Sequence, residues 1–230
     1  MAKRTGPFEE GRWPQRLRAV AVSPPPHPRL HGYDIARDLS RHYSLAEVMV
    51  LAVTGELPDE ASGRALEIAL IIASTCPINE APTHGAALAR VMGAPVGNAL
   101  ATGFLIGCEA SRATVEDHRE LLQWLRDGRE GPPPPCARAN EDHEADVVEE
   151  LRRALAPLGP SLAPPKGTSR TAALLSVMWA CGLRCEDALI AALSWAKTLS
   201  IAAESVGNPR GELSNLPNRV PDFQYEAPGS

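Results

Sequence analysis

Two side chains near small-residue segments are candidates for acid–base chemistry. His84 stands beside Gly85, where a helix is expected to begin, and a helix N-terminus favours a neutral imidazole that donates hydrogen bonds. Glu109 follows a second segment of small and apolar residues and could serve as a carboxylate base. The alternatives are a histidine that caps or packs at a turn and a solvated glutamate at a helix end. His84 and Glu109 are therefore the candidate catalytic residues.

Arginine side chains supply candidate anion-binding groups, because guanidinium forms paired hydrogen bonds with carboxylates and phosphates. Arg90 is the strongest candidate, since it interrupts a segment expected to be buried, and arginine is seldom buried without a partner. Arg112 and His31 complete the predicted substrate-binding set, although solvated helix faces would explain most of the arginines equally well. The sequence contains neither a Gly-rich phosphate loop nor a nucleotide-binding fingerprint that would indicate a bound nucleotide.

The cysteines predict no metal site. Cys181 and Cys185 are four apart in an expected helix and would share one face of it. Neither a second cysteine pair nor a nearby histidine completes a four-ligand set, so small buried side chains in a reducing compartment are the simpler interpretation. Cys108 is likewise expected in the core. No metal or cofactor is predicted.

The elements that must position these residues are helices. Ser44, with Glu47 three residues later, has the spacing of a capping box at the start of an apolar helix. Gly55 suits the left-handed position at its end, and Pro58 prevents the helix from continuing. Asp59 can then cap a second helix. This pattern predicts a helical hairpin.

Composition agrees with an all-α fold. Aromatic residues are only 4% of the 230, and alanine and leucine are abundant, which favours packed helices over a β-sandwich. The formal net charge of −5 argues against nucleic-acid binding. No uninterrupted apolar run approaches the roughly 20 residues that span a bilayer, and the N-terminus lacks the apolar core of a signal peptide. We therefore expect a cytoplasmic protein that binds neither nucleic acid nor membrane.

A literal motif is more specific than this periodicity. The segment from His31 to Pro58 contains Gly-Tyr-Asp-Ile followed by Gly-Glu-Leu-Pro, and it resembles the N-terminal part of the citrate synthase family, which includes short citryl-CoA lyase-like members. Residues 188–204 resemble that family's closing helix. The resemblance implies a citrate synthase-like helical large domain with a strongly reduced small domain. It also implies chemistry at a carbon–carbon bond next to a CoA thioester.

The catalytic positions of that family are not matched. After the small-residue helix the family has His-Gly-Gly-Ala, whereas this chain has Gly-Cys-Glu-Ala at residues 107–110. The chain also lacks the family's aspartate before its last helices. Losing a base and its hydrogen-bond donors together should abolish the standard reaction. Any activity is therefore expected to depend on other residues, such as His84 and Glu109.

Prolines divide the chain into five predicted segments. These are an extended N-terminal segment (1–30), the first part of the helical domain (31–128), a Pro-rich and acidic connector or reduced small domain (129–167), the second part of the helical domain (168–206) and an extended C-terminal tail (207–230).

Two functions are compatible with these observations. The first is a citrate synthase- or citryl-CoA lyase-like enzyme that acts on a C–C bond of an acyl-CoA or related carboxylic acid through non-standard residues. The second is a non-catalytic subunit that dimerises with an active paralogue. The resemblance implies a homodimer or heterodimer in either case. Its ligand would be a small carboxylic acid or an acyl-CoA.

Overall fold

The computed structural model describes three stretches of the chain, residues 19–23, 27–139 and 142–211. Those parts of the predicted N-terminal segment and tail that fall on residues 1–18 and 212–230 lie outside the described residues. The chain divides into two compact units, Met1–Ser44 and Leu45–Ser230.

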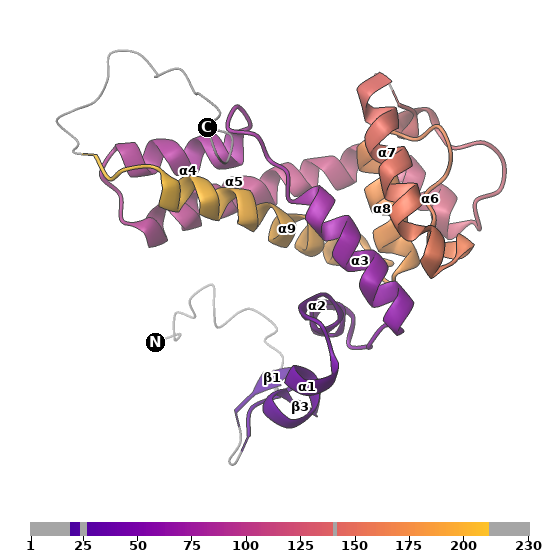
Figure 1. The fold of residues 1–230 in the computed structure, drawn as a ribbon, viewed down its shortest axis with the longest axis horizontal. Coiled ribbons are helices and arrows are strands. Elements are labelled where there is room, and N and C mark those ends of the chain that lie inside the picture. The colour runs from indigo at the N-terminus through magenta and orange to yellow at the C-terminus, as the bar shows by residue number, and fades with distance from the viewer. Residues whose placement is uncertain (1–18, 24–26, 140–141, 212–230) are drawn as a thin grey trace, which may run out of the picture. The chain divides into compact units, whose positions relative to one another are not determined.

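The first unit contains a small antiparallel sheet. Its strands are β1 (Ala21–Val22), β2 (Arg29–Leu30) and β3 (Tyr33–Asp34), followed by the π-helix η1 (Ile35–Leu39) and α1 (Ser40–His42) (Figure 1). His31 and Gly32, with φ of 47° and 89°, form the two-residue turn between β2 and β3, where left-handed backbone is favoured. The Gly-Tyr-Asp-Ile motif lies in this unit, where its Tyr33 and Asp34 pair with β2, whereas the sequence-based division begins the helical domain at residue 31.

Acidification is expected to open the turn that follows β3. The Asp34 carboxylate accepts hydrogen bonds from the amides of Arg37 at 2.8 Å and Ala36 at 3.0 Å, and the Arg37 bond in particular holds the pKa of Asp34 below its usual 3.8. Because folding lowers this pKa, the stabilisation is complete well above pH 3.8 and is lost as the pH falls through the folded-state pKa. An NMR titration should show the Asp34 carboxyl and the Arg37 amide shifting together with a midpoint below 3.8.

The Asp34→Asn variant is the control for this titration, because asparagine retains an acceptor oxygen that does not titrate. Its Arg37 amide should show no acid transition. A carboxyl midpoint at or above 3.8 in the wild type would contradict the cap.

The second unit is helical. Its α-helices are α2 (Leu45–Thr54), α3 (Glu60–Ala73), α4 (Ala81–Val91), α5 (Val96–Asp117), α6 (Arg119–Arg126), α7 (Asp142–Leu155), α8 (Arg170–Ala180) and α9 (Glu186–Gly207). Its short 3-10 turns are η2 (Pro135–Ala137), η3 (Ala156–Leu158) and η4 (Pro160–Leu162). The predicted all-α class is confirmed, with the small sheet of the first unit as the one addition among the described residues.

The predicted hairpin of α2 and α3 is present, with Gly55 at the end of the first helix and Asp59 at the start of the second, as expected. Gly55 has φ of 83° and donates its amide to Leu51 O at 2.8 Å, which ends α2. The Asp59 carboxylate accepts the Ser62 amide at 2.8 Å and starts α3. Local sequence therefore fixes both ends of this connection.

Small residues bring α4, α5 and α9 into close contact, and the three helices run side by side in Figure 1. The buried stripe of α5 recurs every four residues: Ala99, Gly103, Gly107, Ser111 and Val115. The opposite face is exposed, with Leu105 68% accessible. Gly97, Ala101 and Ala113 lie outside this stripe and are exposed, whereas α8 is buried from Ala172 to Trp179.

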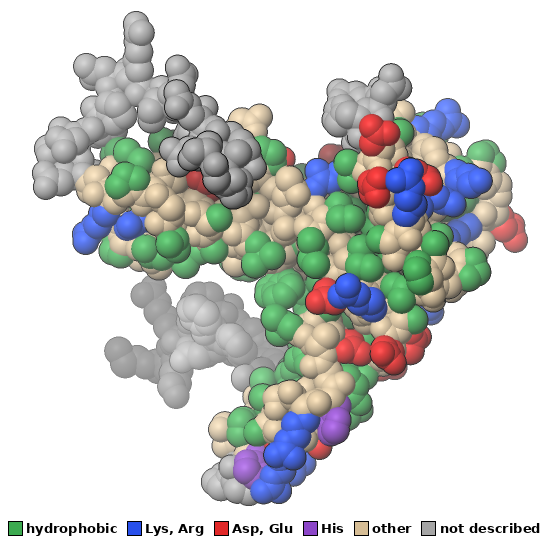
Figure 2. Space-filling model, in the orientation of Figure 1, with side chains coloured by type: hydrophobic (Ala, Val, Ile, Leu, Met, Phe, Trp, Pro, Cys, Tyr) green, Lys and Arg blue, Asp and Glu red, His purple; other side chains and the backbone are tan. Residues whose placement is uncertain are grey.

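The predicted connector contains regular structure. Its acidic stretch forms α7, which packs against α3 and α8. Glu149 and Glu150 pair with Arg152 and Arg153 along its outer side, and Figure 2 shows this gathering of charged side chains over α7. The spacing of the charged residues in this Pro-rich and acidic connector or reduced small domain allows helical i,i+3 and i,i+4 ion pairs.

Helix α9 is long and apolar enough, by length and composition alone, to cross a membrane, and 39% of its most apolar stretch is buried. The sequence shows no uninterrupted apolar run long enough to span a bilayer here, because Lys197 lies in the middle of the helix. α9 packs along α4 and α5. Core helices of soluble proteins pass the same test, so this is weak evidence for a membrane span.

Candidate functional site

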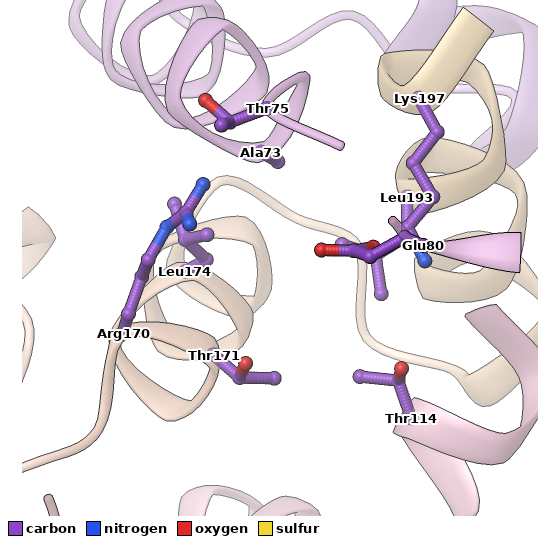
Figure 3. A pocket seen from close by; sticks show the side chains of 9 residues that line it. All are labelled: Ala73, Thr75, Glu80, Thr114, Arg170, Thr171, Leu174, Leu193 and Lys197. Atoms are coloured by element: carbon purple, nitrogen blue, oxygen red, sulfur yellow. The ribbon is translucent and has the colours of Figure 1, made fainter. Parts of the chain in front are cut away.

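A pocket of about 230 Å³ lies within the second unit, beside the loop that joins α3 to α4. It is lined by Ala73, Thr75, Glu80, Thr114, Arg170, Thr171, Leu174, Leu193 and Lys197 (Figure 3). Ala73, Leu174 and Leu193 are buried and form its apolar part. The other side chains carry two positive charges, one negative charge and three hydroxyl groups.

Arg170 is the first residue of α8 and extends into the pocket (Figure 3). One guanidinium nitrogen, Nη2, donates to Ile72 O at 2.6 Å, which anchors the side chain to the end of α3. Its Nε is buried and has no hydrogen-bond partner within the described part of the chain. An unsatisfied buried donor is costly, and the guanidinium group of which it is part is suited to bind an anion that enters the pocket.

The N-terminus of α8 adds to this positive character. Ser169 caps the helix by accepting the Ala172 amide at 3.2 Å. The amides of Arg170 and Thr171, in the first turn, have no intrahelical acceptor. Such a helix end carries a partial positive charge and attracts anions.

The loop that supplies Thr75 and Glu80 is held to α9. Ser200 on α9 donates its hydroxyl to Ser74 O and accepts the Cys76 amide at 3.3 Å. Thr83 closes the other end by donating to Pro77 O at 2.6 Å. The loop is thus fixed at both ends, and its side chains have a defined direction.

Glu80 is the carboxylate that lines the pocket, and it points into it from the side opposite Arg170 (Figure 3). The Cys76 thiol donates to Glu80 Oε2 at 3.3 Å. Burial raises the pKa of the Cys76 thiol, and the neighbouring Glu80 raises it further, so the thiol remains protonated at neutral pH. Cys76 is therefore a hydrogen-bond donor here rather than a thiolate nucleophile.

Lys197 comes from the middle of α9 and has no hydrogen bond or ion pair among residues 19–23, 27–139 and 142–211. Lys197 is half-buried, and an ammonium group without a partner among these residues is suited to an anionic ligand. Together with Arg170 it gives the pocket two cations against the single carboxylate of Glu80. The arrangement can bind a carboxylate or phosphate group while Glu80 accepts a hydrogen bond or a proton.

The predicted residues Glu109 and Arg112 lie elsewhere. They form an ion pair at 2.9 Å on the outer face of α5, where their side chains are 72% and 50% exposed, and Arg112 also pairs with Glu116 at 2.7 Å. Neither lines the pocket. Their roles in catalysis and substrate binding stay predictions.

His84, Arg90 and His31 also lie outside the lining of the pocket. His84 is half-buried in α4, and its amide donates to Glu80 O at 3.0 Å. Arg90 donates from Nη1 to Ala94 O at 2.7 Å beyond the end of α4, while its Nε is buried without a partner among the described residues. His31 occupies the turn of the first unit. Their proposed roles likewise stay predictions.

Sequence reasoning missed Arg170, Lys197 and Glu80. One signal was present, because Lys197 interrupts an apolar helix in the same way as Arg90 interrupts α4. The Ser-Arg-Thr string at residues 169–171 also places an arginine directly after a helix cap. Across the described ranges, no group of three or more His, Cys, Asp and Glu side chains could hold a metal ion.

Neither a protein-family model nor a curated protein sequence matches the chain. Solved structures do match. Citryl-CoA lyase from Hydrogenobacter thermophilus superposes with a TM-score of 0.66 at 14% identity, covering 94% of this chain and 98% of that one. The expected citrate synthase-like helical fold is thereby confirmed.

Two structures of ATP citrate lyase share the fold as well. A mutant of the Methanosaeta concilii enzyme, in complex with (3S)-citryl-CoA, has a TM-score of 0.63 at 12% identity. The Methanothrix soehngenii enzyme, in complex with citrate and coenzyme A, has a TM-score of 0.58 at 12% identity. In both cases 96% of this chain is covered, but only 44% of the other chain.

Proposed function

We propose that the protein is a citryl-CoA lyase-like protein that binds a carboxylic acid or acyl-CoA and acts on one of its C–C bonds through non-standard residues. The observation that carries this proposal is the pocket lined by both Arg170 and Lys197, neither of which forms an ion pair with a carboxylate among the described residues. The fold shared with citryl-CoA lyase supports the substrate class. The pocket supplies the anion-binding chemistry that such substrates require.

Each group has a role in this proposal. Arg170 and Lys197 bind the carboxylate, or stabilise the negative charge that develops on a carbonyl oxygen when the C–C bond breaks or forms. Glu80 is the group able to accept a proton. Ala73, Leu174 and Leu193 exclude water from one side of the ligand, which strengthens these charge interactions.

Calorimetric titration of the purified protein with citrate, CoA and acetyl-CoA tests the proposal. Lys197→Met should weaken binding of the ligand that the wild type binds by about tenfold or more, because one hydrogen bond to a charged group is worth about 1.5–3 kcal/mol. Lys166→Met is the matched control, since Lys166 is exposed and does not line this pocket. The control should bind as the wild type does.

A second candidate is the non-catalytic subunit, which one observation favours. Large apolar side chains are exposed on two neighbouring helices: Phe104 and Leu105 on α5, and Trp195, Leu199 and Val206 on α9. Exposed apolar groups of this kind indicate an association surface. We propose pairing with a second copy or with a related active chain in the cytoplasm. A well-folded oligomer that binds none of the three ligands would overturn the enzyme proposal and support this one.

A further inference from the structure

We propose that Cys76 and Glu80 together select ligands that carry a hydroxyl group beside their carboxylates. In this arrangement Glu80 is the specificity-determining residue and Cys76 is a positioning residue that acts through it. The inference rests on the proposed function, because it requires a carboxylic acid held by Arg170 and Lys197.

The position of the Cys76 thiol is closely determined. The residue is 4% exposed, its amide donates to Ser200 Oγ at 3.3 Å, and its Sγ lies 3.9 Å from Thr83 Oγ1. From this fixed position the thiol donates to Glu80 Oε2 at 3.3 Å. Although Glu80 itself is exposed, one of its carboxylate oxygens is therefore held by a buried donor.

The other oxygen of Glu80 is available to a ligand. Oε1 has no hydrogen bond or ion pair in the part of the chain that the structure describes, and the side chain points into the pocket (Figure 3). An ionised carboxylate only accepts hydrogen bonds. A ligand hydroxyl facing Oε1 would be bound, whereas a ligand carboxylate there would be repelled.

The charges around the pocket then orient the ligand. Arg170 on α8 and Lys197 on α9 attract the carboxylates, while α5 contributes only the neutral Thr114. A hydroxy acid offers carboxylates to the two cations and a hydroxyl to Glu80 at once, and the corresponding acid without the hydroxyl leaves Glu80 Oε1 without a donor. Sites built around a hydrogen bond to a substrate hydroxyl discriminate strongly against analogues that lack it.

Citrate and tricarballylate are the probes, because they differ by one hydroxyl group. Calorimetry of the full chain should give wild-type Kd values at least about tenfold lower for citrate, as expected for one hydrogen bond to a charged acceptor. In Glu80→Ala the two Kd values should become equal, with tricarballylate bound as tightly as by the wild type or more tightly. Cys76→Ala should reduce the citrate preference while leaving tricarballylate unchanged, and Cys76→Ser, which retains a donor, should restore it.

Glu56→Ala is the matched control, since Glu56 is exposed and does not line the pocket. It should keep the wild-type ratio of Kd values. If Glu80→Ala binds both acids and still prefers citrate about tenfold, the hydroxyl assignment is overturned while the carboxylate pocket stands. If Cys76→Ala, folded by thermal melting, keeps the full preference, the positioning role is overturned. If the wild type binds neither acid, the carboxylate-binding pocket is overturned and this inference with it.

Discussion

An Arg170→Glu variant is expected to lose citrate binding by at least about 100-fold, the largest effect of any single substitution in the pocket. The change removes the guanidinium group, whose buried Nε has no partner among the described residues. It also adds a carboxylate to a site that already contains Glu80, so that like charges repel the ligand. Losing a charged hydrogen-bond partner and gaining a repulsive charge together account for the size of the effect.

Calorimetry with citrate measures this loss, and thermal melting in saturating citrate provides a second readout. The wild type should melt at a higher temperature when citrate is present, since a ligand that binds only the folded state stabilises it, and Arg170→Glu should show no such shift. Arg126→Glu is the matched control, because Arg126 is exposed on α6 and lies outside the lining of the pocket. Citrate binding within threefold of the wild type in Arg170→Glu would show that the pocket is not the carboxylate site.

A Gly103→Val variant is expected to lower the free energy of unfolding by about 3 kcal/mol, since inserting atoms into a well-packed core costs about 1–3 kcal/mol and occasionally more. A Cβ at this position would lie 2.5 Å from Ile201 Cγ2, 2.8 Å from Pro82 O and 3.0 Å from Ala86 Cβ. Two of these contacts involve atoms of α4 that cannot rotate away. Relief therefore requires α4 or α9 to move away from α5.

Urea unfolding followed by circular dichroism measures the loss. Gly97→Ala provides the contrast, because it lies on the same helix and an added Cβ there meets nothing within 4 Å. Alanine is a better helix former than glycine by about 1 kcal/mol, so Gly97→Ala should leave stability unchanged or raise it slightly. If Gly103→Val unfolds at the wild-type urea concentration, then the close packing of α4, α5 and α9 is not what stabilises this unit.

Much of the secondary structure could be predicted because its causes are local. Gly55 and Asp59 end one helix and begin the next through hydrogen bonds to residues within four positions. The small residues of α5 are spaced to form one face of a helix. Such signals are contained in a few consecutive residues, and a single sequence is enough to read them.

The positions of the predicted site residues could not be derived from local sequence signals. Glu109 and Arg112 have the residue types of a functional pair, but the rotation of α5 against its neighbours places both on the exposed face. Arg90 was expected to need a partner, and it has one in the carbonyl of Ala94 beyond its own helix. Residue type and helical spacing do not reveal which face of a helix turns toward a cavity.

The sequence by itself determined the helical class, the capped hairpin and the segments rich in small residues, because each depends on side chains that are neighbours along the chain. Only the tertiary structure decided the pocket. Arg170, Lys197 and Glu80 come from α8, from α9 and from the residue that precedes α4, and they meet only when these helices have packed. The physical reason is that hydrogen bonds within a turn act over a few residues, whereas the juxtaposition of distant charges depends on how the apolar faces of several helices fit together.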